Sequence, residues 1–143
     1  MTVYRDASKA DWPAIKLLLN DSGLPLDGVW EHLSQFVVCM DEDEIVGCIG
    51  AEVRGEAALL RSLAVATRSQ QGGIGTKLVS RLLTRLKAQG VRDVGLLTMT
   101  ADDFFTALGF AAVARDRIPS ALHISEEFKG ACPDSATAML LRI

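Results

Sequence analysis

The stretch that decides the fold runs from Ser69 to Leu83 and reads SQQGGIGTKLVSRLL. Its three glycines, Gly72, Gly73 and Gly75, stand directly ahead of apolar residues spaced as on one face of a helix. Glycine weakens a helix start unless the backbone must adopt a special conformation or allow a close approach. Two explanations stay open at this point: a plain turn before a helix, or a backbone that a ligand approaches closely.

The residues on either side of the glycines predict a strand, LLRSLAV, and a long helix from about Gly73 to Gln89. Amide N–H groups in the turn between them would converge on one small volume. The helix dipole adds positive potential there, so a pyrophosphate would fit. A Walker A loop is excluded because Lys77 is wrongly spaced. A dinucleotide fingerprint is excluded because Leu78 stands where its third glycine would be.

The rest of the chain alternates helical and β-rich segments. TVYRDAS predicts an edge strand, followed by helices over Lys9 to Asp21 and Val29 to Ser34. FVVCM, EIVGCIGAEV and ALLRSLAV predict tightly joined strands, with the acidic turn Asp41 to Glu44 as a hairpin tip. After the long helix come the strand VRDVGLLTMT, the short helix ADDFFTAL, and the strands FAAVA and TAMLLRI. This order predicts an α/β (α+β) fold, a mixed, mostly antiparallel sheet of about six or seven strands flanked by about four helices.

Composition limits the class of protein. The 143 residues fit a single domain, residues 1–143, and 49% hydrophobic residues can fill a core without disulfides. A net charge of −3 disfavours a nucleic-acid partner. No apolar run is long enough for a membrane span and the N-terminus is polar, so a cytoplasmic protein is expected. Cys39, Cys48 and Cys132 form no paired motif and predict reduced, buried thiols and no metal site.

Three motifs, in order, resemble those of the GCN5-related N-acetyltransferase (GNAT) superfamily. QQGGIG, residues 70–75, resembles its motif A, (Q/R)xxGx(G/A). ADDFFTALGF, residues 101–110, resembles its motif B, and LLRSLAV resembles the strand ahead of motif A. The chain is more narrowly similar to short amino-acid acetyltransferases, including relatives of N-acetylglutamate synthase and proteins associated with arsenic resistance.

The resemblance implies acetyl-CoA as the cofactor, in a V-shaped opening where LLRSLAV and VGLLTMT splay apart. Backbone groups of Leu63 and Val65 would pair with the pantetheine arm like an added strand. Amides of Gln71 to Thr76 would hold the pyrophosphate, and Phe104 would pack near the thioester. The implied cofactor-binding residues are Leu63, Ala64, Val65, Gln70, Gln71, Gly72, Gly73, Ile74, Gly75, Thr76 and Phe104.

One position departs from the pattern of the family. The family often has a tyrosine in motif B that protonates the leaving thiolate, and the aligned residue here is Phe105. A thiol whose pKa is roughly 8.5 is a tolerable leaving group, and water, Ser62 or Thr98 would assist its departure. Phe105 in place of the tyrosine therefore leaves open that the protein binds acyl-CoA without catalysing a reaction.

Amine acetylation needs a neutral amine held beside the thioester carbonyl and a route for its proton. The N–H of Val65 would stabilise the oxyanion. Glu52 and Glu56 are the candidate bases, and desolvation of Glu52 inside an apolar strand should raise its pKa. The competing interpretation is that each glutamate is a solvent-facing strand residue.

Arg61 is the predicted substrate-binding residue because it lies inside an apolar strand beside the cofactor segment, with Ser62 contributing to the same pocket. A guanidinium can donate two hydrogen bonds to one carboxylate. This favours an amino acid or a similar small anionic amine as the acceptor substrate. A salt bridge to a glutamate across the sheet is the alternative. The irregular segments Asn20 to Gly28 and Ala114 to Phe128 are expected to wall the acceptor site.

The leading hypothesis is an acetyl-CoA-dependent N-acetyltransferase, in which a small carboxylate-bearing amine attacks the thioester directly. A protein N-acetyltransferase is a related alternative. A non-catalytic acyl-CoA-binding sensor is the alternative from a different class, and Phe105 supports it. By analogy with the family, an exposed edge strand would allow a homodimer.

Overall fold

The computed structural model describes residues 1–143. Its strands are β1 (Thr2–Asp6), β2 (Val37–Asp41), β3 (Glu44–Arg54), β4 (Ala57–Val65), β5 (Asp93–Thr98), β6 (Ala111–Val113) and β7 (Thr137–Arg142). Its α-helices are α1 (Trp12–Asp21), α2 (Ile74–Ala88) and α3 (Asp102–Ala107). Short 3-10 or π turns are η1 (Lys9–Asp11), η2 (Trp30–Gln35), η3 (Thr67–Gly72), η4 (Arg115–Arg117), η5 (Ser120–Ile124) and η6 (Glu127–Ala131).

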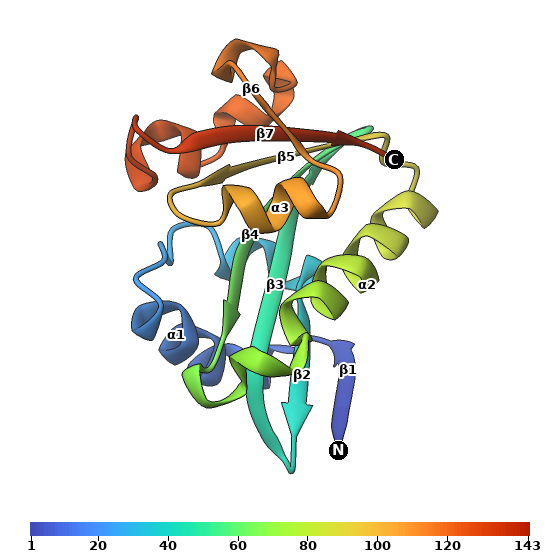
Figure 1. Cartoon of the computed structure of the whole chain (residues 1–143), viewed down its shortest axis with the longest axis vertical. Helices are drawn as coiled ribbons and strands as arrows, with labels where there is room; N and C mark the ends of the chain where they lie inside the picture. Colours follow the sequence, from blue (N-terminus) through green and yellow to red (C-terminus); the bar gives the residue numbers. More distant parts are fainter.

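The strands form one seven-stranded sheet in the order β1-β2-β3-β4-β5-β7-β6. Every neighbouring pair is antiparallel except β4 and β5, which are parallel. In Figure 1, β2, β3 and β4 run along the length of the molecule, whereas β5 and β7 run across it. The predicted mixed, mostly antiparallel sheet is confirmed.

Helices cover both faces of the sheet because the side chains of a strand alternate between its faces. On one face α2 packs Leu78, Leu82 and Leu86 against residues such as Val37 of β2. On the other face α1 and η2 pack against the next residue of that strand, Val38. Figure 1 shows α1 and α2 on either side of the central strands. None of the helices has the length and apolar character needed to cross a membrane.

The predicted N-terminal helix begins differently from the expectation. Lys9–Asp11 is a 3-10 turn, and α1 begins at Trp12 with proline in its first turn, where the missing N–H costs no hydrogen bond. The carboxylate of Asp11 accepts a hydrogen bond from the N–H of Ser8 at 2.7 Å. The second predicted helix is also a 3-10 turn, η2.

Gly50 in β3 leaves room for an aromatic ring, and its replacement tests the packing of the sheet. A Cβ at this position would lie 2.1 Å from Cε1 of Phe36, a fully buried residue. We expect Gly50→Ala to lower the free energy of unfolding by about 1–3 kcal/mol in denaturant titrations, because the ring has nowhere to move. Gly72→Ala is the control, since its Cβ would approach only Ile74, at 4.0 Å. Equal stability of the two variants would contradict the packing described.

Candidate active site

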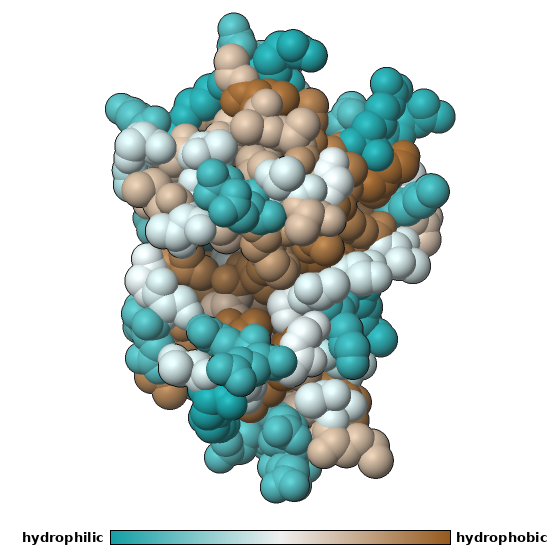
Figure 2. Space-filling model, viewed as in Figure 1, coloured by the Kyte–Doolittle hydropathy of each residue, from teal (hydrophilic) through white to brown (hydrophobic).

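A cavity lies where β4 and β5 separate. The two parallel strands pair only over Ala57–Leu59 and Asp93–Gly95. Beyond these residues a cavity of about 740 Å³ opens between them. Its walls come from β4, from β5 with the loop after it, from the segment after α1 and from the segment before β7. Figure 2 shows an apolar hollow across the middle of the molecule, at the level where the strands part in Figure 1.

A bend in β4 accompanies this separation. Ser62 has a φ of +62°, which is uncommon for a residue with a side chain. The register with β3 shifts at the same place, between Cys48 and Gly50, which marks a β-bulge. Bulges increase the local twist and redirect a strand, and strained backbone is concentrated at functional sites. The structure thus places Ser62, a predicted site residue, at the bend and on the cavity wall.

The end of β4 presents backbone groups to the opened side. The N–H of Ala66 donates to the carbonyl of Val46 on β3, so the N–H of Val65 points to the opposite side by alternation along the strand. On that side β5 has separated from β4. The carbonyl of Val65 accepts a hydrogen bond from the side-chain amide of Gln70 at 3.1 Å. Val65 therefore offers the cavity its N–H more readily than its carbonyl.

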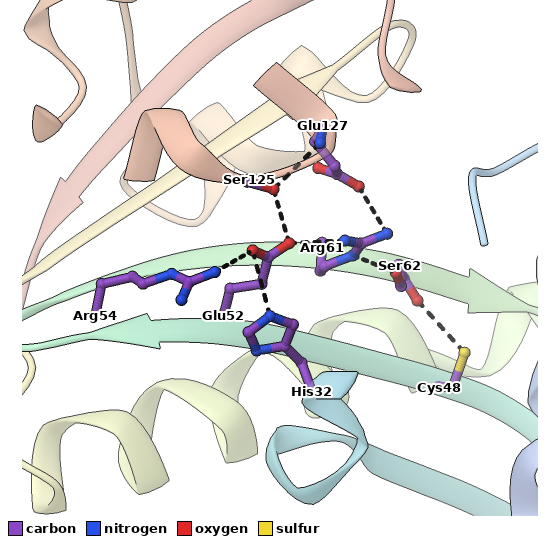
Figure 3. A network of polar contacts seen from close by, with 8 residues as sticks. All are labelled: His32, Cys48, Glu52, Arg54, Arg61, Ser62, Ser125 and Glu127. Carbon is purple, nitrogen blue, oxygen red and sulfur yellow. Dashed lines mark hydrogen bonds and ion pairs between the residues drawn. The ribbon is translucent and has the colours of Figure 1, made fainter. Parts of the chain in front are cut away.

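The buried guanidinium of Arg61 organises the polar groups of the site (Figure 3). Its Nη1 donates to Oε2 of Glu52 at 2.7 Å, and its Nε donates to Oγ of Ser62 at 3.0 Å. Its Nη2 lies 3.4 Å from Oε2 of Glu127 and has no hydrogen-bond partner. The salt bridge expected as an alternative is therefore present, and one edge of the guanidinium still lacks an acceptor.

Glu52 is held as an ionised structural partner. Its carboxylate accepts hydrogen bonds from Ser125 Oγ at 2.7 Å and from Arg61, and the residue does not line the cavity. Burial raises its pKa, but the hydrogen bonds from Ser125 and Arg61 outweigh burial and hold the pKa below its ordinary value. The prediction that desolvation raises the pKa of Glu52 is wrong, because hydrogen bonds to the charged form prevail. Glu56, the other candidate base, is exposed and pairs with Arg92 at 3.3 Å.

Glu127 is a site residue that the sequence reasoning missed. It begins η6, is only 4% exposed and lines the cavity. Burial raises its pKa to about 7, with Arg61 opposing the rise and Glu52 adding to it. The residue lies in a segment expected to wall the site, next to the exposed Glu126. An irregular segment has no periodicity that would show which of the two acids faces inward.

Both segments predicted to wall the acceptor site reach the cavity. Asn20–Gly28 contributes the backbone and side chains from Ser22 to Pro25 together with Asp27. Ala114–Phe128 contributes Glu127, and the residues just after it complete that wall. No group of three or more His, Cys, Asp or Glu residues is placed to hold a metal ion.

The glycine segment joins η3 to α2 through a left-handed residue. Gly73 has a φ of +73° and directly precedes the helix, and no atom lies within 4 Å of the position where its Cβ would be. Its role is therefore conformational. The ring of Phe104 lies against Gly75, 3.6 Å from its Cβ position, whereas the neighbouring Phe105 lines the cavity. Within the motif, Gln70 is the residue that reaches the cavity wall.

The fold and the motifs identify the class of protein. The family model for the acetyltransferase (GNAT) domain matches residues 32–112, which is more than half of the chain. This match runs from η2 into β6 and includes the parted strands and the glycine segment. The chain belongs to the GNAT acetyltransferase family.

The chain is similar to several acetyltransferases in sequence and in structure. The chain is 26% identical over 124 residues to an amino-acid acetyltransferase of Neisseria meningitidis, covering 80% of this chain and 28% of that protein. It is 29% identical to an uncharacterised N-acetyltransferase of Chlorobaculum tepidum, covering 82% and 81%. N-acetylglutamate synthase from Neisseria gonorrhoeae, solved with coenzyme A and N-acetyl-glutamate, superposes with a TM-score of 0.85 at 20% identity, over 99% of this chain and 35% of that one. A Mycobacterium tuberculosis protein solved with CoA superposes at 0.78 with 25% identity, over 99% of both chains.

Removal of Arg61 should leave the buried carboxylate of Glu52 with only one arginine contact, the longer one to the partly exposed Arg54, at 3.4 Å. We expect Arg61→Met to lower the free energy of unfolding by about 3–5 kcal/mol, because removing one partner of a buried ion pair is strongly destabilising. Adding Glu52→Gln to that variant should recover part of the loss, since the amide carries no charge. The measurement is denaturant unfolding of both single variants and the double variant. Additive losses without coupling would show that the pair contributes no interaction energy.

Proposed function

We propose that this chain is an acetyl-CoA-dependent N-acetyltransferase that acts on the amine of a small, carboxylate-bearing acceptor. The observation that carries the proposal is the buried Nη2 of Arg61, which has no hydrogen-bond partner and belongs to a residue that lines the cavity between β4 and β5. A buried donor without an acceptor is costly, so an acceptor on a ligand binds there favourably. The amino-acid acetyltransferase and N-acetylglutamate synthase among the similar proteins support this class of acceptor.

The residues of the chain fit an acyl-CoA at the parted strands. The opened side of Leu63 and Val65 faces no paired strand, so an extended pantetheine would add to it as a strand does. The N-terminus of the 15-residue helix α2, entered through Gly73, favours a pyrophosphate. Gln70, Gln71, Gly72, Ile74, Gly75 and Thr76 complete this loop, with Ala64 and Phe104 beside it. When bound, acetyl-CoA supplies an acyl group activated as a thioester.

The residues of β4 have separate tasks in this proposal. The N–H of Val65 donates to the carbonyl oxygen that gains negative charge when the amine attacks. The Nη2 donors of Arg61 hold the carboxylate of the acceptor, and Ser62 fixes the guanidinium through its Nε. Glu52 positions Arg61 and does not act as the base, because its carboxylate already accepts hydrogen bonds from Arg61 and Ser125.

Two alternatives from the sequence stay distinct from this proposal. A non-catalytic acyl-CoA sensor is supported by Phe105, which has no hydroxyl group and is 4% exposed on the cavity wall. A protein acetyltransferase is less well supported, because the segments after α1 and before β7 wall the cavity. A single domain over residues 1–143, a cytoplasmic location and a homodimer stay predictions.

A thiol-release assay tests the proposed function. Purified protein with acetyl-CoA is offered each proteinogenic amino acid, and release of free CoA is followed while calorimetry measures CoA binding. Turnover with at least one amino acid is the expected result. CoA binding without turnover on any amine favours the sensor, and absence of CoA binding overturns the assignment of the cavity.

The glycine turn allows a matched test of the CoA loop. We expect Gly73→Val to weaken CoA binding by at least about tenfold in calorimetry, because a β-branched residue resists the left-handed conformation that the turn requires. Gly90→Val is the control, because Gly90 has a φ of +91° and free space around its Cβ but lies at the other end of α2. Equal losses of CoA affinity in the two variants would contradict a specific role for the loop.

A further inference from the structure

The contact between Arg61 and Glu127 is a weak ion pair at the cavity wall. Oε2 of Glu127 lies 3.4 Å from Nη2 of Arg61, and this nitrogen makes no hydrogen bond. The other two nitrogens of the guanidinium donate to neighbours, Nη1 to Glu52 and Nε to Ser62. Arg61 is therefore fixed in place, and its Nη2 keeps a donor without an acceptor beside the Glu127 carboxylate.

The two opposite charges on this wall of the cavity match a zwitterion. In an α-amino acid one carbon atom separates an ammonium group from a carboxylate group, so the two charges lie within a few ångströms of each other. At 3.4 Å, Nη2 of Arg61 and Oε2 of Glu127 are too close for a ligand to pass between them. A zwitterion would instead bind beside the pair, from the cavity that both residues line, with its carboxylate toward Nη2 and its ammonium toward Glu127. Each charge of the weak pair then gains a close, opposite partner, which strengthens the hydrogen bonds.

We infer that Glu127 receives the ammonium group of the acceptor and takes up the proton that must leave before the amine can attack. This inference rests on the proposed acetyltransferase function and adds a residue to it. Glu127 is then a catalytic residue, since its carboxylate touches the reacting nitrogen. Glu52, the other buried acid, does not line the cavity and is held by Arg61 and Ser125.

The proton transfer balances within the site. One N–H bond of the ammonium breaks and one O–H bond forms on Glu127, so that the nitrogen recovers its lone pair. That lone pair forms the new C–N bond with the acyl carbon of the thioester as the C–S bond breaks. The second proton lost by the nitrogen goes to the departing thiolate, and Glu127 later returns its proton to water.

The groups around Glu127 are consistent with a proton acceptor that works near neutral pH. Burial raises its pKa to about 7, while Arg61 from β4 favours the charged form and Glu52 from β3 disfavours it. Cys132, at the end of the same segment, has a pKa raised to about 11 by burial and stays a neutral thiol. Asp27 on the opposite wall is exposed. A general base performs best when its pKa lies near the working pH.

The test compares Glu127→Gln with Glu126→Gln, its exposed neighbour. The substrate is the amino acid that the wild type acetylates fastest. For the wild type, kcat/KM should increase as the pH rises through about 7 and level off at higher pH; this increase is the ascending limb of the pH profile. Glu127→Gln should lose about 10²–10⁴-fold of kcat/KM and lose this limb, while its CoA affinity stays within about twofold. Glu126→Gln should behave like the wild type. If Glu127→Gln keeps both the wild-type kcat/KM and its rise with pH near 7, the inference is overturned.

A binding measurement separates this inference from the proposed function. With CoA present, calorimetry compares the free amino acid with its N-acetyl derivative, which has no ammonium group; glutamate is the probe if no amino acid turns over. Glu127→Gln should lower the affinity for the free amino acid at least about tenfold. The affinity for the N-acetyl derivative should be unchanged. Equal binding of the free amino acid by both proteins refutes the role of Glu127 alone. Absence of both turnover and amino-acid binding in the wild type refutes the proposed function and the inference together.

A conservative variant guards against loss of folding. Thermal unfolding of Glu127→Gln should match the wild type at pH 6, where most Glu127 is already protonated given its pKa of about 7. If this variant does not fold, Glu127→Asp replaces it. The shorter carboxylate should keep the pH limb and lose about tenfold of kcat, and loss of the limb in that folded variant overturns the inference.

Discussion

The structure depends on the point at which β4 and β5 stop pairing. Buried backbone N–H and carbonyl groups need hydrogen-bond partners, and a strand in the middle of a sheet normally finds them on both sides. Here β4 keeps β3 on one side but loses β5 after Leu59, so its last residues face a cavity. The bulge at Ser62 bends the strand at this place. Because β7 pairs with β5 along its whole length, the sheet stays continuous while its centre opens.

Two similar carboxylates at the opening have different pKa values because they have different neighbours. Glu52 and Glu127 are both buried beside the guanidinium of Arg61. Glu52 accepts a close hydrogen bond from Ser125 in addition to one from Arg61, and its pKa is lowered. Glu127 has the longer contact with Arg61 and a hydrogen bond with the Cys132 side chain, and burial raises its pKa to about 7. One acid thus fixes the cation, and the other keeps a proton affinity suited to exchange near neutral pH.

Most of the fold could be predicted because its elements follow local rules. A high content of β-branched residues marked the strands before and after the acidic turn, helical spacing marked α2, and the hairpin tip was found between Asp41 and Glu44. The family was indicated by the resemblance of three ordered motifs to the GNAT superfamily, and it is confirmed. The start of the first helix was less well predicted, because a capping interaction around Asp11 and the proline after it favour a 3-10 turn before α1.

The sequence by itself determined the order of the elements, the family and the place of Arg61 and Ser62 on the strand beside the cofactor segment. Only the tertiary structure decided which acids surround Arg61 and in which protonation state. Ser125 and Glu127 lie more than sixty residues along the chain from Arg61, as their numbers show, and they reach it because the segment before β7 folds back over β3 and β4. The pKa of a buried carboxyl is set by the donors around it, and such donors belong to segments that only the folded chain brings together.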